Sequence, residues 1–485
     1  MRPHRSAAAI CLLVAGCAVG PDFQRPAAPD VSAYRPAGSE RAPAPIAGAD
    51  AQRFVAGTDV PAQWWRLFRS PPLDALVARA LAANPDLDAA RAALRVAQES
   101  AAAQRGAFWP QVSASVQPMR QMIAAGLASP LNSGASLYSL HTAQVDVAYT
   151  ADVFGGNRRA VESLDAQAEF QRFELEAARL TIVANVVAAA IQEASLRGQI
   201  AAAESMAKMQ QEMLNIAHRQ LELGAIAEAG VVAQEAALAQ TRAALPPLRK
   251  QLAQTRDLLV ALTGGFPDKE PAETFDLERL ELPNELPLSL PSKLVERRPD
   301  VRAAEAQAHA AAAQVGVAFA ARLPQFSIDA GVGSVASHLG DLFKAGGGFW
   351  SVAGAVVQPI FDGGALTHRQ AAAEAAYDQA LAQYRATVVA AFQNVADTLH
   401  ALDQDAEELD ATGAALDAAT RSLAIARRQV ELGDISRLAL LNAEQTYQQA
   451  LIGQVQTRAS RYADTAALFQ ALGGGWWLQE NEAPR

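Results

Sequence analysis

The sequence predicts a mainly α-helical chain that carries two pairs of β-strands and is built as two copies of one long unit. Three observations predict this class: motifs recur at a near-constant offset, two pairs of segments alternate apolar with polar residues, and long alanine-rich stretches follow each pair. Pro85-Asp86 recurs as Pro299-Asp300, and Pro110-Gln111 recurs as Pro324-Gln325, both at an offset of 214. Such a long internal repeat implies a pseudo-symmetric architecture rather than two unrelated domains.

The N-terminus predicts a signal peptide over residues 1–16 and a lipid attachment site at Cys17. Arg2 and Arg5 precede a short apolar run, and small residues lead up to Cys17, as in a bacterial lipoprotein cleavage box. The apolar run over 7–15 is too short to span a bilayer. The alternative is an ordinary signal peptide in which the cysteine stands by accident.

Cleavage before an acylated Cys17 would leave no free thiol in the mature chain, because the other cysteine, Cys11, would be removed. This excludes disulfides, thiolate metal sites and a cysteine nucleophile. Cleavage also removes two arginines and no acidic residue, so the formal net charge moves from -10 to -12. That balance excludes a nucleic-acid partner, which would need a basic surface. No later stretch is apolar for long enough to form a transmembrane helix.

The domain organisation follows from the repeat and from composition. Residues 17–61 are rich in proline, alanine and glycine without a period, as in an extended tether behind a lipid anchor. The remaining parts are repeat 1 over 62–264, a connector over 265–291, repeat 2 over 292–475, and a C-terminal tail over 476–485.

Each repeat begins with a short helix pair and continues with two strands, which are recognisable by alternation. In repeat 1 we expect strands at about 111–119 and 141–152, and in repeat 2 at about 325–334 and 349–359. One apolar face and one polar or small face suit either a half-buried soluble sheet or a membrane barrel with a wet lumen.

A long helical hairpin follows each strand pair, at about 157–262 with a tip at Gly224 and at about 364–472 with a tip at Gly433. Glycine is expected at each tip because it most easily takes the left-handed conformation that ends a helix. A seven-residue stripe predicts left-handed supercoiling. Its members in the second hairpin are Leu402, Leu409, Leu416, Leu423 and Val430.

The strand count points to an oligomer. Four strands cannot close a barrel alone, because the smallest single-chain barrels have about eight. Several chains that pool their strands would close one barrel and would align their hairpins into a tube. That arrangement describes a conduit.

The chain resembles a known family, the TolC-like outer-membrane factors of tripartite efflux pumps, and within it the lipoprotein branch. The resemblance covers nearly the whole mature chain and rests on motifs in a fixed order. These are Cys17 followed by Val19-Gly20-Pro21-Asp22-Phe23, Trp64-Trp65, Asn84-Pro85-Asp86-Leu87, Arg297-Arg298-Pro299-Asp300-Val301, Gln358-Pro359-Ile360-Phe361-Asp362-Gly363-Gly364 and Leu472-Gly473-Gly474-Gly475-Trp476-Trp477.

The resemblance implies a homotrimer with a shared twelve-stranded barrel in the bacterial outer membrane and a helical tunnel in the periplasm, with the connector in an equatorial region. It implies passive export of drugs or other small molecules, without catalysis, metal or cofactor. The implied partners are an inner-membrane transporter, a periplasmic adaptor protein, and outer-membrane lipid through acylated Cys17. The adaptor would contact the hairpin tips, which are Leu223, Gly224, Ala225, Leu432, Gly433 and Asp434.

The periplasmic aperture is where this chain departs from the family. Family members commonly carry acidic residues just beyond the second tip, where the sequence has Ala439 and Asn442, with Gly230 and Ala233 as equivalents in the first repeat. The nearby acids that remain as alternatives are Asp434, Glu228 and Glu444.

Other functions have weaker support in the sequence. A methionine stripe at Met206, Met209 and Met213 would suit a soft metal, but methionine at helical spacing is usually packing. The histidines are dispersed, and no hydrolase, P-loop or dinucleotide motif is present. The competing hypotheses are the outer-membrane exit of a protein-secretion system and a lipid-anchored periplasmic coiled-coil spacer.

Overall fold

The structure is a computed structural model that describes residues 18–36, 52–124, 136–269 and 271–478. The predicted signal peptide, Cys17 and the middle of the first strand-connecting loop lie outside these residues. The chain divides into two compact units. The first, here called the strand unit, contains the chain up to Pro26 together with Ala93–Gln171 and Ala304–Tyr384. The second, the hairpin unit, contains Ala27–Ala92, Arg172–Ala303 and Arg385–Arg485.

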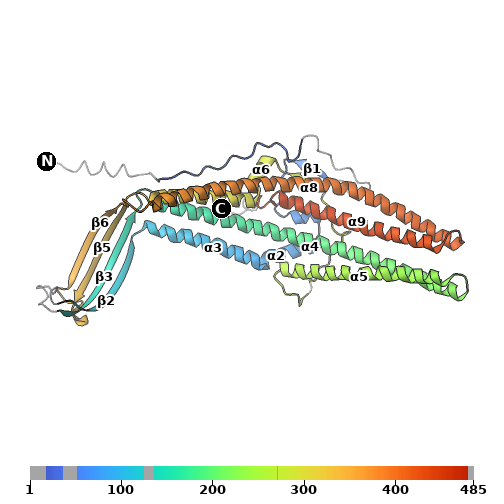
Figure 1. Ribbon diagram of the computed structural model, residues 1–485, viewed down its shortest axis with the longest axis horizontal. Helices are drawn as coiled ribbons and strands as arrows, with labels where there is room; N and C mark the ends of the chain where they lie inside the picture. Colours follow the sequence, from blue (N-terminus) through green and yellow to red (C-terminus); the bar gives the residue numbers. More distant parts are fainter. Residues whose placement is uncertain (1–17, 37–51, 125–135, 270, 479–485) are drawn as a thin grey trace. The chain divides into compact units, whose positions relative to one another are not determined.

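The strand unit contains a four-stranded antiparallel sheet in the order β2-β3-β5-β6 (Figure 1). Its strands are β2 (Gln111–Met122), β3 (Leu137–Ala151), β5 (Gln325–Ala336) and β6 (Gly348–Val357). β3 pairs with β5 and so joins the two repeats, while β2 and β6 form the two edges. The hairpin between β2 and β3 pairs as far as Met122 with Leu137, which is longer than the alternation alone indicated.

The register places the apolar residues of all four strands on one face. Val145 lies opposite Ala114 on β2 and opposite Val332 on β5, and Val332 in turn lies opposite Trp350 on β6. The other face carries polar and small residues, such as Asp146 opposite Ser113 and Gly331. Several of the apolar residues are exposed in the single chain: Val112, Val116, Val145, Ile328, Val332, Trp350, Val352 and Val356.

Helices α3 (Pro85–Arg105) and α7 (Pro299–Ala320) lead into the two strand pairs, and α4 (Gly156–Glu222) and α8 (Ala365–Leu432) lead out of them. An aspartate follows each returning strand and accepts backbone N–H groups at the start of the next helix. Asp152 accepts from Asn157 and Arg158, and Asp362 accepts from Gly364 and Leu366. Free N–H groups at a helix start favour such an acceptor, which fixes where the helix begins.

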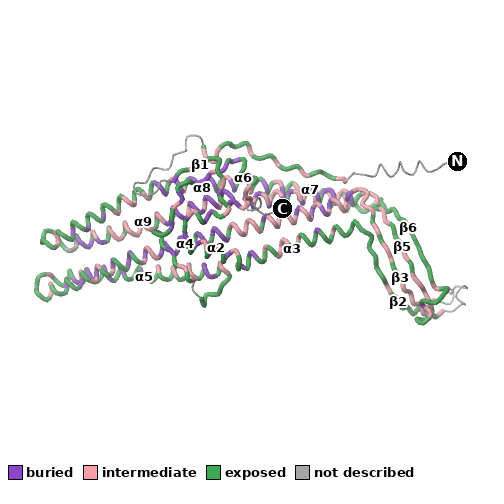
Figure 2. Tube along the Cα trace, turned by 180° about the vertical axis from the view of Figure 1, so that it is seen from behind, coloured by how far each residue is buried: buried purple, intermediate pink, exposed green. Residues whose placement is uncertain are grey.

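The hairpin unit holds the ends of α4 and α8 with their partners α5 (Glu228–Leu262) and α9 (Arg437–Ala471). The predicted seven-residue stripe on α8 is buried or half-buried along its length (Figure 2). None of the helices in the described part of the chain has an apolar stretch long enough to cross a bilayer.

The base of the hairpin unit gathers short elements from distant parts of the sequence. β1 (Arg53–Ala56) pairs in parallel with β4 (Glu285–Leu288), near the short helices η1 (Trp64–Phe68), α2 (Pro71–Ala83) and α6 (Pro291–Arg297). Trp64 is buried against Phe469 of α9, with ring centroids 5.5 Å apart. β1 lies inside the expected tether and β4 inside the expected connector. The predicted fold class, mainly helical with two strand pairs and an internal duplication, is confirmed.

Candidate functional site

The first hairpin turns on a glycine-capped loop between α4 and α5. Gly224 has a φ of +68°, in the left-handed region that glycine adopts without a steric penalty. The Gly224 N–H donates to the Leu221 carbonyl (2.9 Å), and the Ala225 N–H donates to the Gln220 carbonyl (2.8 Å). This pair of bonds defines a Schellman motif, in which amides of the turn satisfy the last helical carbonyls. The first tip is therefore a defined loop.

The second hairpin turns in the same way between α8 and α9. Gly433 has a φ of +81°. Its N–H donates to the Val430 carbonyl (3.1 Å), and the Asp434 N–H donates to the Gln429 carbonyl (2.8 Å). α9 also has an N-terminal cap, because the Ser436 Oγ accepts the Ala439 N–H at 3.3 Å. The two tips thus share one backbone design.

Each tip presents an exposed leucine next to its glycine. Leu223 is 82% exposed and Leu432 is 60% exposed, although leucine is usually buried. Ala225 and Asp434 are also exposed, so all six predicted tip residues face solvent in the single chain (Figure 2). Rigid loops with exposed apolar side chains and accessible glycine backbone are suited to contact another protein.

Beneath the tips, two apolar clusters hold the helices of each hairpin together. The first is formed by α4 and α5 and contains Leu214, Ala217, Val231 and Leu238, with Ile226 packed against it. The second is formed by α8 and α9 and contains Leu423, Ala426 and Leu440, with Ile435 packed against it. Met213 of α4 packs against the second cluster, so the two hairpins contact each other near their tips.

The methionine stripe lies at this contact between the hairpins. Met206 is buried, Met213 packs against the second cluster, and the Met209 Sδ lies 2.8 Å from the Arg427 guanidinium of α8. Within the described residues, no group of three or more histidine, cysteine, aspartate or glutamate side chains is placed to hold a metal ion. Met209 and Met213 therefore contact the second hairpin, and Met206 is a buried side chain of the first.

The predicted aperture positions are exposed at the start of the returning helices. Gly230 and Ala233 lie on α5, and Ala439 and Asn442 lie on α9. Of the three nearby acids, Asp434 and Glu228 are exposed.

Glu444 differs from the other two acids. It is 1% exposed, and neither of its carboxylate oxygens has a hydrogen-bond partner among the residues that the structure describes. Burial raises the pKa of Glu444, and the charge of Arg427 opposes that shift. The Glu444 side chain therefore points into the packed interior of the chain rather than toward its surface.

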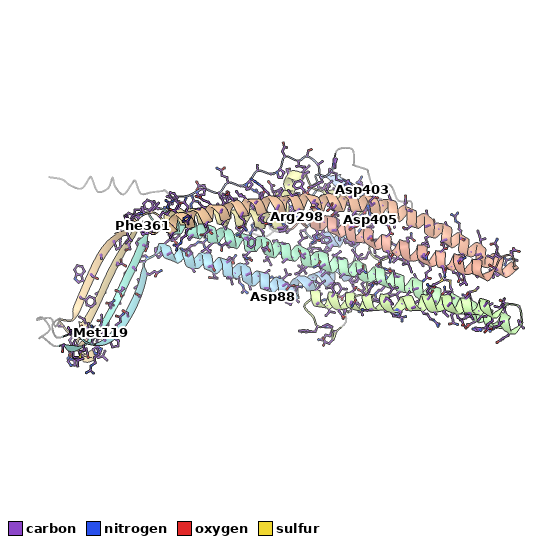
Figure 3. The ribbon with its side chains drawn as sticks, viewed as in Figure 1. Asp88, Met119, Arg298, Phe361, Asp403 and Asp405 are labelled. Carbon is purple, nitrogen blue, oxygen red and sulfur yellow. The ribbon has the colours of Figure 1, made fainter. Side chains whose placement is uncertain are left out.

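A buried polar network at the base of the hairpin unit was not predicted from the sequence. Arg461 of α9 is 1% exposed, and it donates to the Gln52 side chain (2.6 Å) and to the Leu402 carbonyl. Asp405, labelled on α8 in Figure 3, is buried, and burial together with the charge of Asp464 raises its pKa to about 7. Arg35 pairs with Asp403, also labelled in Figure 3.

Two residues of this region, Arg35 and Gln52, come from the segment expected to be a featureless tether. A lone arginine or glutamine in a proline-rich stretch carries no periodic signal. Pairing of the tether with α8 and α9 could be found only from the three-dimensional arrangement.

Comparison with known proteins identifies relatives over nearly the whole chain. The family model described as "Outer membrane efflux protein" matches residues 76–265 and 290–474. The antibiotic efflux pump outer membrane protein ArpC of Pseudomonas putida is 31% identical over 99% of this chain and 96% of its own length. The toluene efflux pump outer membrane protein TtgC of Pseudomonas putida has the same identity and coverage.

A solved structure supports the same relation. The outer-membrane channel OprN superposes with a TM-score of 0.84 at 28% sequence identity, and the match covers 95% of this chain and 100% of that structure. Both repeats of the present chain therefore have counterparts in a solved channel.

Proposed function

The chain belongs to the outer membrane efflux protein family, and we propose that three copies of it form the passive exit duct of one efflux pump. It is an outer-membrane component of an efflux system, as its relatives are. Members of the family are channels. We propose that this chain likewise moves its cargo without catalysing a reaction.

The observation that carries an oligomer is the open sheet, and the number three is taken from the resemblance to the TolC-like family. Among the strands that the structure describes, β2 and β6 each pair along one edge and leave the other edge open. An open edge leaves backbone N–H and C=O groups unpaired, and proteins usually cover or pair such edges. A membrane barrel has no open edge, because its first and last strands pair with each other. Three copies would pair β6 of one subunit with β2 of the next and give about twelve strands, within the range of outer-membrane barrels.

The two faces of the sheet support the same assignment. The apolar face, with Val145, Val332 and Trp350 in one row, would face lipid. The opposite face, with Asp146 next to Ser113 and Gly331, would line a wet lumen. Membrane strands alternate in this way because lipid and water lie on opposite sides of one sheet.

We assign the hairpin tips to docking of the periplasmic adaptor, which in turn connects to the inner-membrane transporter. Leu223-Gly224-Ala225 and Leu432-Gly433-Asp434 are exposed and held in Schellman loops. A partner helix can approach a glycine backbone closely and can cover the adjacent leucine. Docking at both tips of three subunits would place six similar contacts around the tube, three at each kind of tip.

We propose that the aperture at the periplasmic end is lined by neutral side chains rather than by an acidic ring. Ala439, Asn442, Gly230 and Ala233 are exposed just past the tips. Of the three acids considered for the aperture, Asp434 and Glu228 are exposed and Glu444 is buried.

We further propose that Cys17 is acylated and anchors the chain in the outer membrane, with the hairpins in the periplasm. The cleavage box of the sequence supports this step. As cargo we propose small molecules. Two relatives with the same identity to this chain are named for antibiotics and for toluene, so cargo selection is assigned to the transporter rather than to this duct.

Export and conductance test the duct directly. A strain that lacks this gene should retain a fluorescent efflux tracer, and the full-length chain should restore its export. The purified protein should be a trimer that conducts ions in planar bilayers. A monomer that restores export, or a trimer that never conducts even with its cognate adaptor present, would refute the duct.

A further inference from the structure

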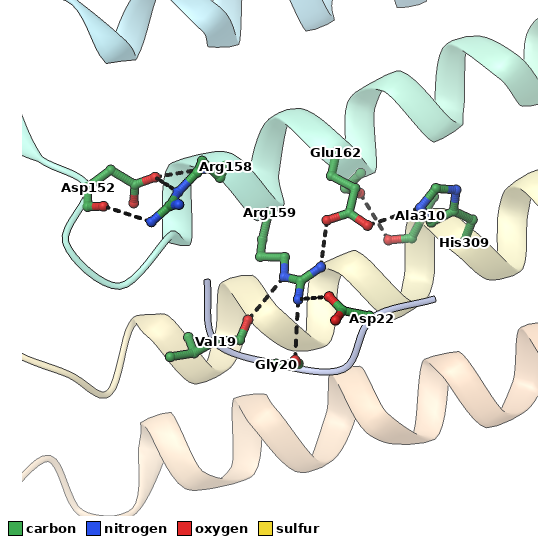
Figure 4. A network of polar contacts seen from close by, with 10 residues as sticks. Val19, Gly20, Asp22, Asp152, Arg158, Arg159, Glu162, His309 and Ala310 are labelled. Carbon is green, nitrogen blue, oxygen red and sulfur yellow. Dashed lines mark hydrogen bonds and ion pairs between the residues drawn. The ribbon is translucent and has the colours of Figure 1, made fainter. Parts of the chain in front are cut away.

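The first residues after the predicted lipid attachment site bind in a site in the strand unit, here called the seat. The seat is formed by Arg159 and Glu162 of α4 and by His309 and Gly316 of α7. Residues 18–23, here called the strap, lie between the start of α4 and the helix α7 (Figure 4). The Val19 N–H donates to the Phe154 carbonyl at 3.0 Å, in the turn between β3 and α4. The strap is thus tied to the end of a strand within two residues of Cys17.

Arg159 of α4 is the centre of the seat. Its side chain donates to the Val19 carbonyl (3.1 Å), to the Gly20 carbonyl (3.3 Å) and to the Asp22 carboxylate (2.6 Å). Its fourth acceptor is Glu162, at 2.7 Å. Arg159 is 5% exposed, and three of its four acceptors belong to the strap. A buried guanidinium without those acceptors would be costly, so this arginine is placed to hold a segment.

The seat continues onto α7. Glu162 also contacts His309, with its Oε1 3.0 Å from the Nε2 of the imidazole. The ring of Phe23 stacks on the His309 ring with centroids 4.6 Å apart. Just beyond the strap, Arg25 pairs with Glu305 at 3.1 Å. Charge, stacking and hydrogen bonds therefore act together on a short stretch of chain.

Glycines make the close approach possible. A Cβ on Gly20, whose φ is +95°, would lie 2.4 Å from the Cα of Gly316. A Cβ on Gly316 would lie 2.8 Å from the Arg159 side chain and 2.9 Å from the Val19 carbonyl. Backbone atoms cannot yield as a flexible side chain does, so only glycine fits on both sides of this contact.

The duplication supports a specific role, because the counterparts of Arg159, His309 and Gly316 in the other repeat are different residues. At the offset of 207 that relates Phe154 to Phe361, Arg159 corresponds to Leu366. At the offset of 214, Gly316 corresponds to Ala102 and His309 corresponds to Arg95. The chain has a single N-terminus, and the residues that hold it occur in a single copy.

We propose that this seat positions the lipid anchor: it fixes where the acyl group on Cys17 enters the membrane relative to the strands. The proposal rests on the acylation of Cys17 proposed above. Cys17 is bonded directly to Ala18, the first residue of the strap, so a single peptide bond separates the proposed acylation site from the strap. With the strap released, the next contact along the chain is the pair of Arg25 with Glu305. Residues 18–25 could span roughly 25 Å when extended.

Two neighbouring arginines provide the variant and its control. Arg159→Ala removes the donor to the strap. Arg158→Ala removes a similar charge from the same turn, but the contacts of Arg158 are with Asp152 of its own turn. Hydrogen exchange of the Val19 amide in the purified acylated protein reports whether the strap is bound in the seat. We expect the Val19 amide to exchange at least about tenfold faster in Arg159→Ala and unchanged in Arg158→Ala.

An insertion separates anchor positioning from simple packing. Four Gly/Ser residues inserted between Ala18 and Val19 would leave residues 19–23 bound in the seat. They would lengthen the chain between these residues and the lipid. The same insertion after Ala28 lies beyond the strap and is the control. We expect the first insertion and Arg159→Ala to lower the yield of trimer in outer-membrane fractions, while the second insertion matches the wild type.

Each outcome bears on one step of the proposal. Normal trimer yield after the insertion at Ala18 would overturn the positioning role and leave the seat as packing. Rapid exchange at Val19 in the wild type would overturn the seat itself. The mass of the N-terminal peptide reports acylation separately, so absence of the lipid would refute the proposed anchor, and with it the positioning role, without bearing on the duct.

Discussion

The hairpin tips give the sharpest test of the docking proposal, through the double substitution Gly224→Asp and Gly433→Asp. Both glycines have positive φ, and a Cβ at either position meets nothing within 4 Å among the described residues. The cost to the fold is therefore backbone strain without a clash. For an L-residue in the left-handed region this is about 1–2 kcal/mol, and less for aspartate and asparagine.

A carboxylate at the end of α4 or α8 adds a small unfavourable interaction with the helix dipole, about 0.3–1 kcal/mol. The hairpin clusters below the tips are not touched, so the trimer should form. Docking responds differently, because an interface that covers the tip would bury an unpaired charge. Such a charge costs about 2–5 kcal/mol, which corresponds to roughly 30-fold weaker binding or more.

The assay is tracer export in the deletion strain, with trimer content measured in the same membranes. We expect the aspartate pair to lose export at normal trimer levels. The matched control is Gly224→Asn with Gly433→Asn, which has the same shape and backbone tolerance but no charge, and should keep most of the export. Unaltered export in the aspartate pair would refute docking at the tips. Loss of the trimer would show that aspartate at these positions destabilises the fold by more than the backbone strain given above.

Three further predictions concern charge and burial. The pKa of Asp405 is raised from 3.8 to about 7 by burial and by Asp464, so the folded state loses stability as pH rises from about 4 to 7; Asp405→Asn should therefore raise the melting temperature at pH 8 more than at pH 5. Arg256→Met removes one of two arginines from the fully buried Glu193 carboxylate and should lower the free energy of unfolding by about 3 kcal/mol, with partial recovery when Glu193→Gln is added. Asn442→Asp should increase cation preference in planar bilayers and Asn442→Lys should decrease it, whereas equal selectivity in both would remove Asn442 from the aperture.

The periodic parts of the fold could be predicted from the sequence. Alternation located the strands because each has an apolar face and a polar or small face, and the recurring Leu-Gly pairs at 223–224 and 432–433 located the turns because glycine alone takes that φ freely. Strand ends were harder to place: β2 runs to Met122, since pairing with β3 continues where alternation fades.

The contacts made by isolated residues could not be predicted. β1 and β4 are four residues each and pair across more than two hundred residues of sequence, so neither carries a period. The strap motif was visible in the sequence, but its partner Arg159 was not, because a single arginine at a helix start is ordinary. Long-range polar contacts depend on the packing that brings them together, and a sequence pattern does not record that packing.

The region past the tips shows how the two repeats could diverge without loss of the hairpin design. Both tips keep the Schellman loop, the exposed leucine and an inward isoleucine, so the shared features are those that end a helix and present a surface. The buried acid of this region, Glu444, lacks a hydrogen-bond partner among the described residues and has a pKa raised by burial, so its charged form is costly. An acidic ring at the aperture would place charge at the surface, whereas the positions proposed for the aperture here, Ala439, Asn442, Gly230 and Ala233, are neutral. With that lining, closure of the periplasmic end is expected to be less sensitive to salt than closure by paired charges.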